Sequence, residues 1–110
     1  MTTLKRELDV LTESMRTQEC YQKYREILGK IQEEPELYEK LNDYRRKNVE
    51  LHYNRRTLKD EVNLERQYHD FMEEELIHEF LFWEQQCLKM LRMIYKEVSE
   101  AVTLDYGFLS

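Results

Sequence analysis

The sequence predicts an all-α fold, an elongated bundle of four to five helices with a long apolar C-terminal helix. Charged residues make up 36% of the 110 residues, and Glu, Lys, Arg, Leu and Gln are frequent, which is typical of helical proteins. Two glycines and one proline leave few positions for turns. No alternating run of β-branched residues indicates a strand. A chain of this length forms one domain, so residues 1–110 are expected to fold as a unit.

The first two helices are expected to meet near residue 17. The apolar residues of the first recur at helical spacing: Leu4, Leu8, Leu11 and Met15. This helix is expected to end near Arg16, and Thr17 is the predicted N-cap of the second, which reaches about Gln32. Gly29 lies inside the second helix, and we interpret it as a point of close approach by a neighbouring helix.

Pro35 is the clearest break in the chain. Proline suits the first helical position, and Glu34 and Glu36 place negative charge at the positive end of the helix dipole. The apolar pattern of this third helix loses phase between Tyr53 and Arg56, where we expect a loop or kink.

Thr57 and Asp60 resemble a capping box in which Asp replaces the usual Glu. The fourth helix follows and is expected to run to Phe71 or Met72. The three acids Glu73–Glu75 suit the start of another helix, but a continuous helix through them is an open alternative. Beyond the last helix, Asp105-Tyr106-Gly107 predicts a turn.

The segment Leu76–Val102 predicts a last helix that is too apolar for one buried face. One face alone holds Ile77, Phe80, Glu84, Cys87, Leu91, Ile94, Val98 and Ala101. The consecutive residues 80–83, all apolar, point around most of the circumference and cannot all face one core. We therefore expect a homodimer, with these interface residues: Phe80, Phe82, Trp83, Cys87, Leu91 and Ile94.

Charge and hydropathy exclude several classes of protein. The net charge of −6 argues against a general nucleic-acid coat or a binder of acidic membranes. No leader peptide and no uncharged stretch long enough to span a membrane is found, so a soluble, cytoplasmic protein is expected. Cys20 and Cys87 stand apart without metal or redox spacing, and we interpret both as small core residues.

Signatures of catalysis are incomplete. Glu75-x-x-His78 matches half of a di-iron site on a helical bundle, but no second copy occurs. Phe82 stands where a zinc-protease signature starting at His78 requires a second histidine. No nucleophile elbow, phosphate loop or zinc cluster is present. We predict no catalytic residue, no metal ligand and no cofactor.

One segment carries a local basic excess. Between residues 45 and 59, six basic residues and one acid give +5, whereas 11 basic and 22 acidic residues elsewhere give −11. Two interpretations of this basic segment stay open: a solvated helix end, or a docking surface for RNA or an acidic protein. The basic docking patch would consist of Arg45, Arg46, Lys47, Arg55, Arg56 and Lys59.

Several short motifs follow one another along the chain: Tyr21-x-x-Tyr24, Glu34-Pro35-Glu36-Leu37, Tyr44-Arg45, Glu84-Gln85 and Leu104-Asp105-Tyr106-Gly107. This order resembles the YlbF/YmcA family of small all-helical bacterial regulators. Two features depart from the family pattern. Glu34 replaces the usual capping Asp, and the Asn-Pro that often opens the last helix is absent.

The resemblance implies an all-α fold, self-association or pairing with a paralogue, and a non-enzymatic role in competence, sporulation and biofilm control. It also implies a place in a complex that modulates RNA cleavage and is associated with iron–sulfur clusters. Here a cluster would depend on Cys20 and Cys87, and four thiolates would require a dimer.

We therefore expect a cytoplasmic regulatory or adaptor protein that acts through protein–protein association. The alternative is a helical RNA-binding accessory protein that uses the Arg45–Lys59 patch. A third hypothesis is a metal- or cluster-dependent enzyme subunit.

Overall fold

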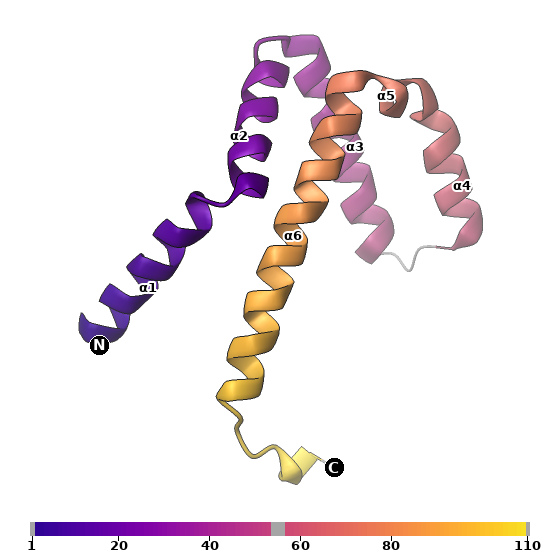
Figure 1. Ribbon diagram of the computed structural model, residues 1–110. Coiled ribbons are helices and arrows are strands. Elements are labelled where there is room, and N and C mark those ends of the chain that lie inside the picture. Colours follow the sequence, from indigo (N-terminus) through magenta and orange to yellow (C-terminus); the bar gives the residue numbers. More distant parts are fainter. Residues whose placement is uncertain (1, 54–56, 110) are drawn as a thin grey trace.

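The computed structural model describes residues 2–53 and 57–109, apart from the side chain of residue 52. These residues form helices and no strand, which confirms the all-α prediction (Figure 1). The elements are α1 (Thr2–Arg16), α2 (Glu19–Gln32), α3 (Pro35–Tyr53), α4 (Leu58–Gln67), α5 (His69–Glu73), α6 (Glu75–Ala101) and the short 3-10 helix η1 (Gly107–Leu109).

The helices run up and down beside one another, and both chain ends lie at the lower end in Figure 1. Helices α2 and α4 run upward, α3 and α6 run downward, and α5 reverses the chain at the top. Helix α1 and the lower half of α6 project away from this body. The radius of gyration is 18.2 Å, whereas a compact chain of this length has about 13 Å. The prediction of an elongated fold is therefore confirmed.

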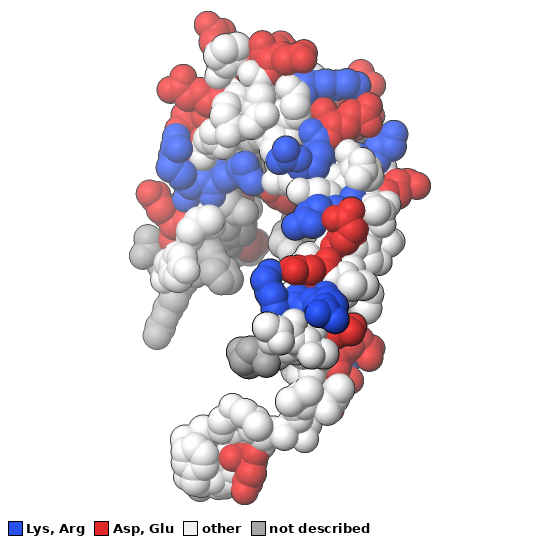
Figure 2. All heavy atoms as spheres, turned by 90° about the vertical axis from the view of Figure 1, so that its left-hand side faces the viewer, with Lys and Arg blue, Asp and Glu red and all other residues white. Residues whose placement is uncertain are grey.

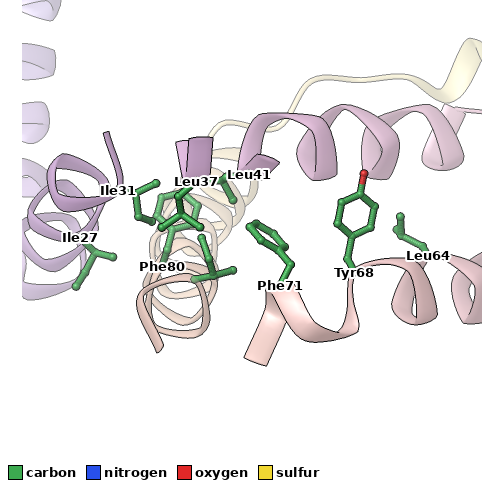
Figure 3. Packing of buried hydrophobic residues seen from close by; sticks show 9 residues of the cluster. Ile27, Ile31, Leu37, Leu41, Leu64, Tyr68, Phe71 and Phe80 are labelled. Carbon is green, nitrogen blue, oxygen red and sulfur yellow. The ribbon is translucent and has the colours of Figure 1, made fainter. Parts of the chain in front are cut away.

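The core lies at the upper end, where α2, α3, α5 and α6 meet. Figure 3 shows its side chains pointing toward one another from these helices, with those of α4 and α5 directed at α3. The buried residues are Ile27, Ile31, Leu37, Leu41, Leu64, Tyr68, Phe71, Ile77 and Phe80. No described residue of α1 is buried. The core thus fixes the upper half of the molecule and leaves the lower half of α6 without a covering helix.

Two predicted helix starts are confirmed. Helix α3 begins at Pro35. At α4 the capping box is complete, because the amide of Asp60 donates to Thr57 Oγ1 and the amide of Thr57 donates to Asp60 Oδ2, both at 3.2 Å. The loop predicted between Tyr53 and Arg56 lies largely outside the described residues.

Two predictions about α2 are wrong. Thr17 does not cap it, because its hydroxyl donates to the carbonyl oxygen of Ser14 at 2.7 Å and the N-cap is Gln18. No helix approaches Gly29 closely, since a Cβ atom there would meet no atom within 4 Å.

The region from Leu58 to Met72 holds two helices instead of one. Helix α4 ends before Tyr68, whose backbone leaves the helical region at φ −112° and ψ 17°. Its ring packs edge-on against Tyr44 of α3 with centroids 5.3 Å apart. The additional break makes six α-helices among the described residues, where four to five were predicted. The open question at Glu73–Glu75 is answered by a break, because Glu74 is extended.

The chain after α6 contains the predicted turn. The amide of Gly107 donates to Asp105 Oδ1 at 2.8 Å, and η1 begins at Gly107.

Candidate functional site

A groove of about 630 Å³ lies between the end of α1, α2, α3 and the middle of α6. Side chains from all four helices line it. Most of its wall is apolar and includes Met15 of α1 and Leu81, Leu88 and Leu91 of α6. A mostly apolar groove with a few polar groups is typical of a binding site.

A polar pair joins two walls of this groove. Arg45 of α3 donates from Nη2 to Glu84 Oε2 of α6 at 3.2 Å. The guanidinium of Arg45 also lies over the Phe80 ring, 5.3 Å from its centroid. Glu84 is the one acid in the apolar face of α6, and this contact explains its presence there. Because both side chains keep solvent contact, the pair contributes about 1 kcal/mol or less and mainly orients α3 against α6.

Three sulfur atoms meet at the α2–α6 side of the groove. Cys20 Sγ of α2 donates to Met90 Sδ of α6 at 4.0 Å. Cys87 stands one helical turn before Met90 on α6, and its thiol lies near that of Cys20. Burial, followed by the neighbouring Cys20, raises the pKa of the Cys87 thiol to about 11. Both cysteines are half-buried, as expected for small packing residues, but they are not apart as the sequence suggested.

The pairing of the cysteines had a weak signal in the sequence. Cys20 shares a helical face with Tyr24, Ile27 and Ile31, and Cys87 shares one with Phe80. Those two faces pack together in the core, which brings the two thiols into contact. Spacing within one helix cannot reveal that contact, because it depends on which helices become neighbours.

Two exposed apolar stripes extend downward from the groove. On α1, Leu4, Leu8 and Leu11 are 64%, 50% and 37% exposed. On α6, Leu88, Leu91 and Val98 are 41%, 48% and 55% exposed. The named residues are four and three residues apart on α1 and three and seven apart on α6, which are spacings between a and d positions of a coiled coil. We call these surfaces the α1 stripe and the α6 stripe.

The predicted interface residues divide into different environments. Phe80 is fully buried within the chain, so the prediction that it contacts a second chain is wrong. Phe82 is 51% exposed and its ring lies edge-on to Trp83, with centroids 4.9 Å apart. Leu91 is exposed, and Trp83, Cys87 and Ile94 are half-buried. For these five residues the interface stays a prediction.

The described residues of the predicted basic docking patch make different contacts, and the patch stays a prediction. Arg45 points to Glu84 of α6, Arg46 pairs with Asp43, and Lys47 lies over the Tyr68 ring at 5.3 Å. Lys59 is exposed on α4. Arg55 and Arg56 lie outside the described residues. On the face shown in Figure 2, basic and acidic side chains are interspersed.

Residues considered for metal binding remain separate. Within residues 2–53 and 57–109, no group of three or more His, Cys, Asp and Glu side chains could hold a metal ion. Glu75 and His78 are exposed near the start of α6. An iron–sulfur cluster commonly needs four thiolates, and one chain supplies two, so the residues of one chain do not fit it. No described helix is long and apolar enough to cross a membrane.

Comparisons with known proteins give one match. The model of a family described as control of competence regulator ComK, YlbF/YmcA, matches residues 4–103. No curated protein and no solved structure matches the chain. The matched range contains the six α-helices almost entirely, including both stripes and the groove.

Proposed function

Since this chain belongs to the YlbF/YmcA family, we propose that it is a cytoplasmic, non-enzymatic regulator that acts by binding other protein chains. The family is described by its control of a competence regulator, and that description names regulation and not a reaction. A role in competence-type regulation is therefore supported at the family level. The mechanism, association through helical surfaces, is supported by features of this chain.

The observation that carries the proposal is the pair of exposed stripes. Helix α1 buries no residue, although three leucines repeat along one of its faces. The α6 stripe likewise lies outside the core, which ends near Phe80. Contiguous exposed apolar surface of this kind marks interaction sites in soluble proteins. Full burial of a fully exposed leucine contributes about 1.5–3 kcal/mol, and each of these partly exposed leucines would contribute a part of that.

A second copy of this chain is the partner that fits best. The α1 stripe spans a helix of 15 residues, about 22 Å long. The α6 segment from Leu88 to Ala101 is about 21 Å long. Because the two stripes match in length and spacing, α1 of each copy can pack against α6 of the other. That arrangement uses the same contact twice, as a two-fold symmetric dimer does.

The groove joins the two stripes into one surface. Met15 continues the α1 stripe into the groove, and Leu88 and Leu91 continue the α6 stripe into it. The proposed interface therefore starts in the groove and extends along both projecting helices. A paralogue that keeps both stripes would bind in the same way.

The RNA-binding alternative has less support. RNA binding by a protein with a net charge of −6 requires cations that act together on one surface. Arg45 and Lys47 instead contact different helices, because residues two apart on a helix point in nearly opposite directions.

Sedimentation velocity with substituted chains tests the proposal. We expect Leu8→Glu and Leu91→Glu each to shift the protein from dimer to monomer, because each places a charge in an apolar seam. Val62→Glu is the matched control, because Val62 is 42% exposed on α4 outside both stripes. It should leave the dimer intact. Circular dichroism verifies that each variant keeps its helices.

The variant Phe82→Glu tests whether the interface lies on the α6 stripe or on the exposed surface around Phe82. Phe82 is as exposed as Leu91 but lies outside the α6 stripe. If Phe82→Glu alone dissociated the dimer and Leu91→Glu did not, the interface would lie around Phe82 and the proposed stripe contact would be wrong. If every chain, the unsubstituted one included, sedimented as a monomer, self-association itself would be wrong.

A further inference from the structure

We propose that Cys20 and Cys87 form a modification site, in which an oxidant converts the two thiols into a reversible intrachain disulfide that links α2 to α6. The proposal rests on the contact between two thiols that are far apart in the sequence. Both cysteines belong to one chain, so the link forms without a second copy.

The fold holds the two thiols in contact. Helices α2 and α6 run side by side in the upper half of the molecule (Figure 1). Ile27 and Ile31 of α2 and Ile77 and Phe80 of α6 lie in the same core cluster. With the helices fixed in this way, Cys20 lies against the turn of α6 that holds Cys87 and Met90, and the two thiols must approach to the length of a disulfide, about 2.05 Å. A disulfide here requires no change in helix order or pairing.

The thiols are also accessible. Both cysteines are half-buried, and Cys87 and Met90 line the groove. A small oxidant can therefore reach the pair without unfolding of the chain whenever no second copy occupies the groove. This distinguishes the site from a cysteine sealed in a core, which is inert to oxidants. Met90 adds a third sulfur atom at 4.0 Å from Cys20 Sγ but has no thiol and does not enter the reaction.

A low-molecular-weight disulfide is a sufficient oxidant. One protein thiol loses its proton, and its sulfur attacks a sulfur of the oxidant. A mixed disulfide forms, and the first small thiolate leaves. The second protein thiol then loses its proton and attacks the protein sulfur of the mixed disulfide, which releases the second small thiolate. The protein dithiol is oxidised by two electrons, the small disulfide is reduced by two, and the two protons end on the released thiols.

Peptide mapping tests the proposal directly. The full chain is incubated with oxidised glutathione, digested without reductant and analysed by mass spectrometry. We expect a linked pair of peptides containing Cys20 and Cys87, which dithiothreitol separates. A mixture of unlabelled chain and chain labelled with nitrogen-15 identifies the type of link. Linked peptides that carry a single isotope are intrachain.

Two outcomes would overturn the proposal. The first is glutathione attached to single cysteines with no Cys20–Cys87 link. The second is a link whose peptides carry both isotopes, which would place the bond between chains.

Variants and an unfolded control keep the test specific. Cys20→Ser and Cys87→Ser should each abolish the link, whereas Met90→Leu should retain it, because the thioether takes no part. In guanidinium chloride the unsubstituted chain should form the link at least about tenfold more slowly, because unfolding removes the proximity of the thiols. An equal rate in the folded and unfolded chain would contradict a preformed thiol pair.

Discussion

At the scale of single residues, Phe80 and Phe82 show how one helix creates two different environments. Phe80 is fully buried, whereas Phe82 is 51% exposed. Two residues along an α-helix turn through more than half a circle, so the two rings point to opposite sides. The sequence predicted that residues 80–83 could not share one core, and this holds. It could not select the buried one, because all four residues are apolar.

Replacing these two rings should therefore have unequal effects on stability. Phe80→Ala should lower the free energy of unfolding by about 3–5 kcal/mol, because it leaves a cavity in the core. Phe82→Ala is the matched control on the same helix and should cost about 1 kcal/mol or less. Urea denaturation followed by circular dichroism measures both. Equal losses for the two variants would mean that the core does not centre on Phe80.

The Cys87 thiol should make stability depend on pH in the alkaline range. Its pKa is raised to about 11 in the folded chain, first by burial, whereas an unfolded thiol has a pKa of about 8.5. Below pH 8.5 both states are protonated and the stability is at its full value. Between about pH 8.5 and 11 only the unfolded state loses the proton, so the stability falls as pH rises.

The comparison that isolates this effect uses Cys87→Ala under reducing conditions. The stability of the unsubstituted chain should fall more steeply between pH 8.5 and 10.5 than that of the variant. Chemical denaturation at several pH values measures both slopes. Parallel curves would show that the folded environment does not favour the protonated thiol.

At the scale of helices, the sequence predicted the helix starts that depend on residues of the same helical turn. Pro35 opens α3, and Thr57 with Asp60 caps α4, because each acts within one turn of its own helix. The break at Tyr68 was not predicted. No glycine or proline stands there, and the break coincides with packing of the ring against Tyr44 of another helix. Such a contact between helices leaves no trace in the periodicity of one helix.

The two threonines that the sequence marked as caps should differ when they are replaced. Thr57→Ala should lower the free energy of unfolding by about 1 kcal/mol, because it removes the bond that satisfies the amide of Asp60. Thr17→Ala should cost about 0.5 kcal/mol or less, since Thr17 caps no helix and is exposed. Thermal unfolding of both variants provides the measurement. A larger loss for Thr17→Ala would contradict the assigned caps.

At the scale of the whole molecule, the elongated shape follows from where apolar residues lie in the sequence. The end of the first helix near Arg16 was predictable from periodicity. The groove was not, because four helices build it from residues distant in the sequence. The exposure of the α1 stripe was also not predictable. An apolar helix face has the same sequence pattern whether its own chain or a second chain covers it.

The central claim is that a second chain covers α1 and the lower half of α6. Hydrogen exchange measured at two protein concentrations, one dilute and one concentrated, tests it most directly. Because α1 buries no residue within one chain, its amides should exchange readily when the protein is dilute. We predict that protection of residues 2–16 and 88–101 rises with concentration, while protection around Ile31 and Leu41 does not change. Equal protection of both segments at the two concentrations would contradict the claim.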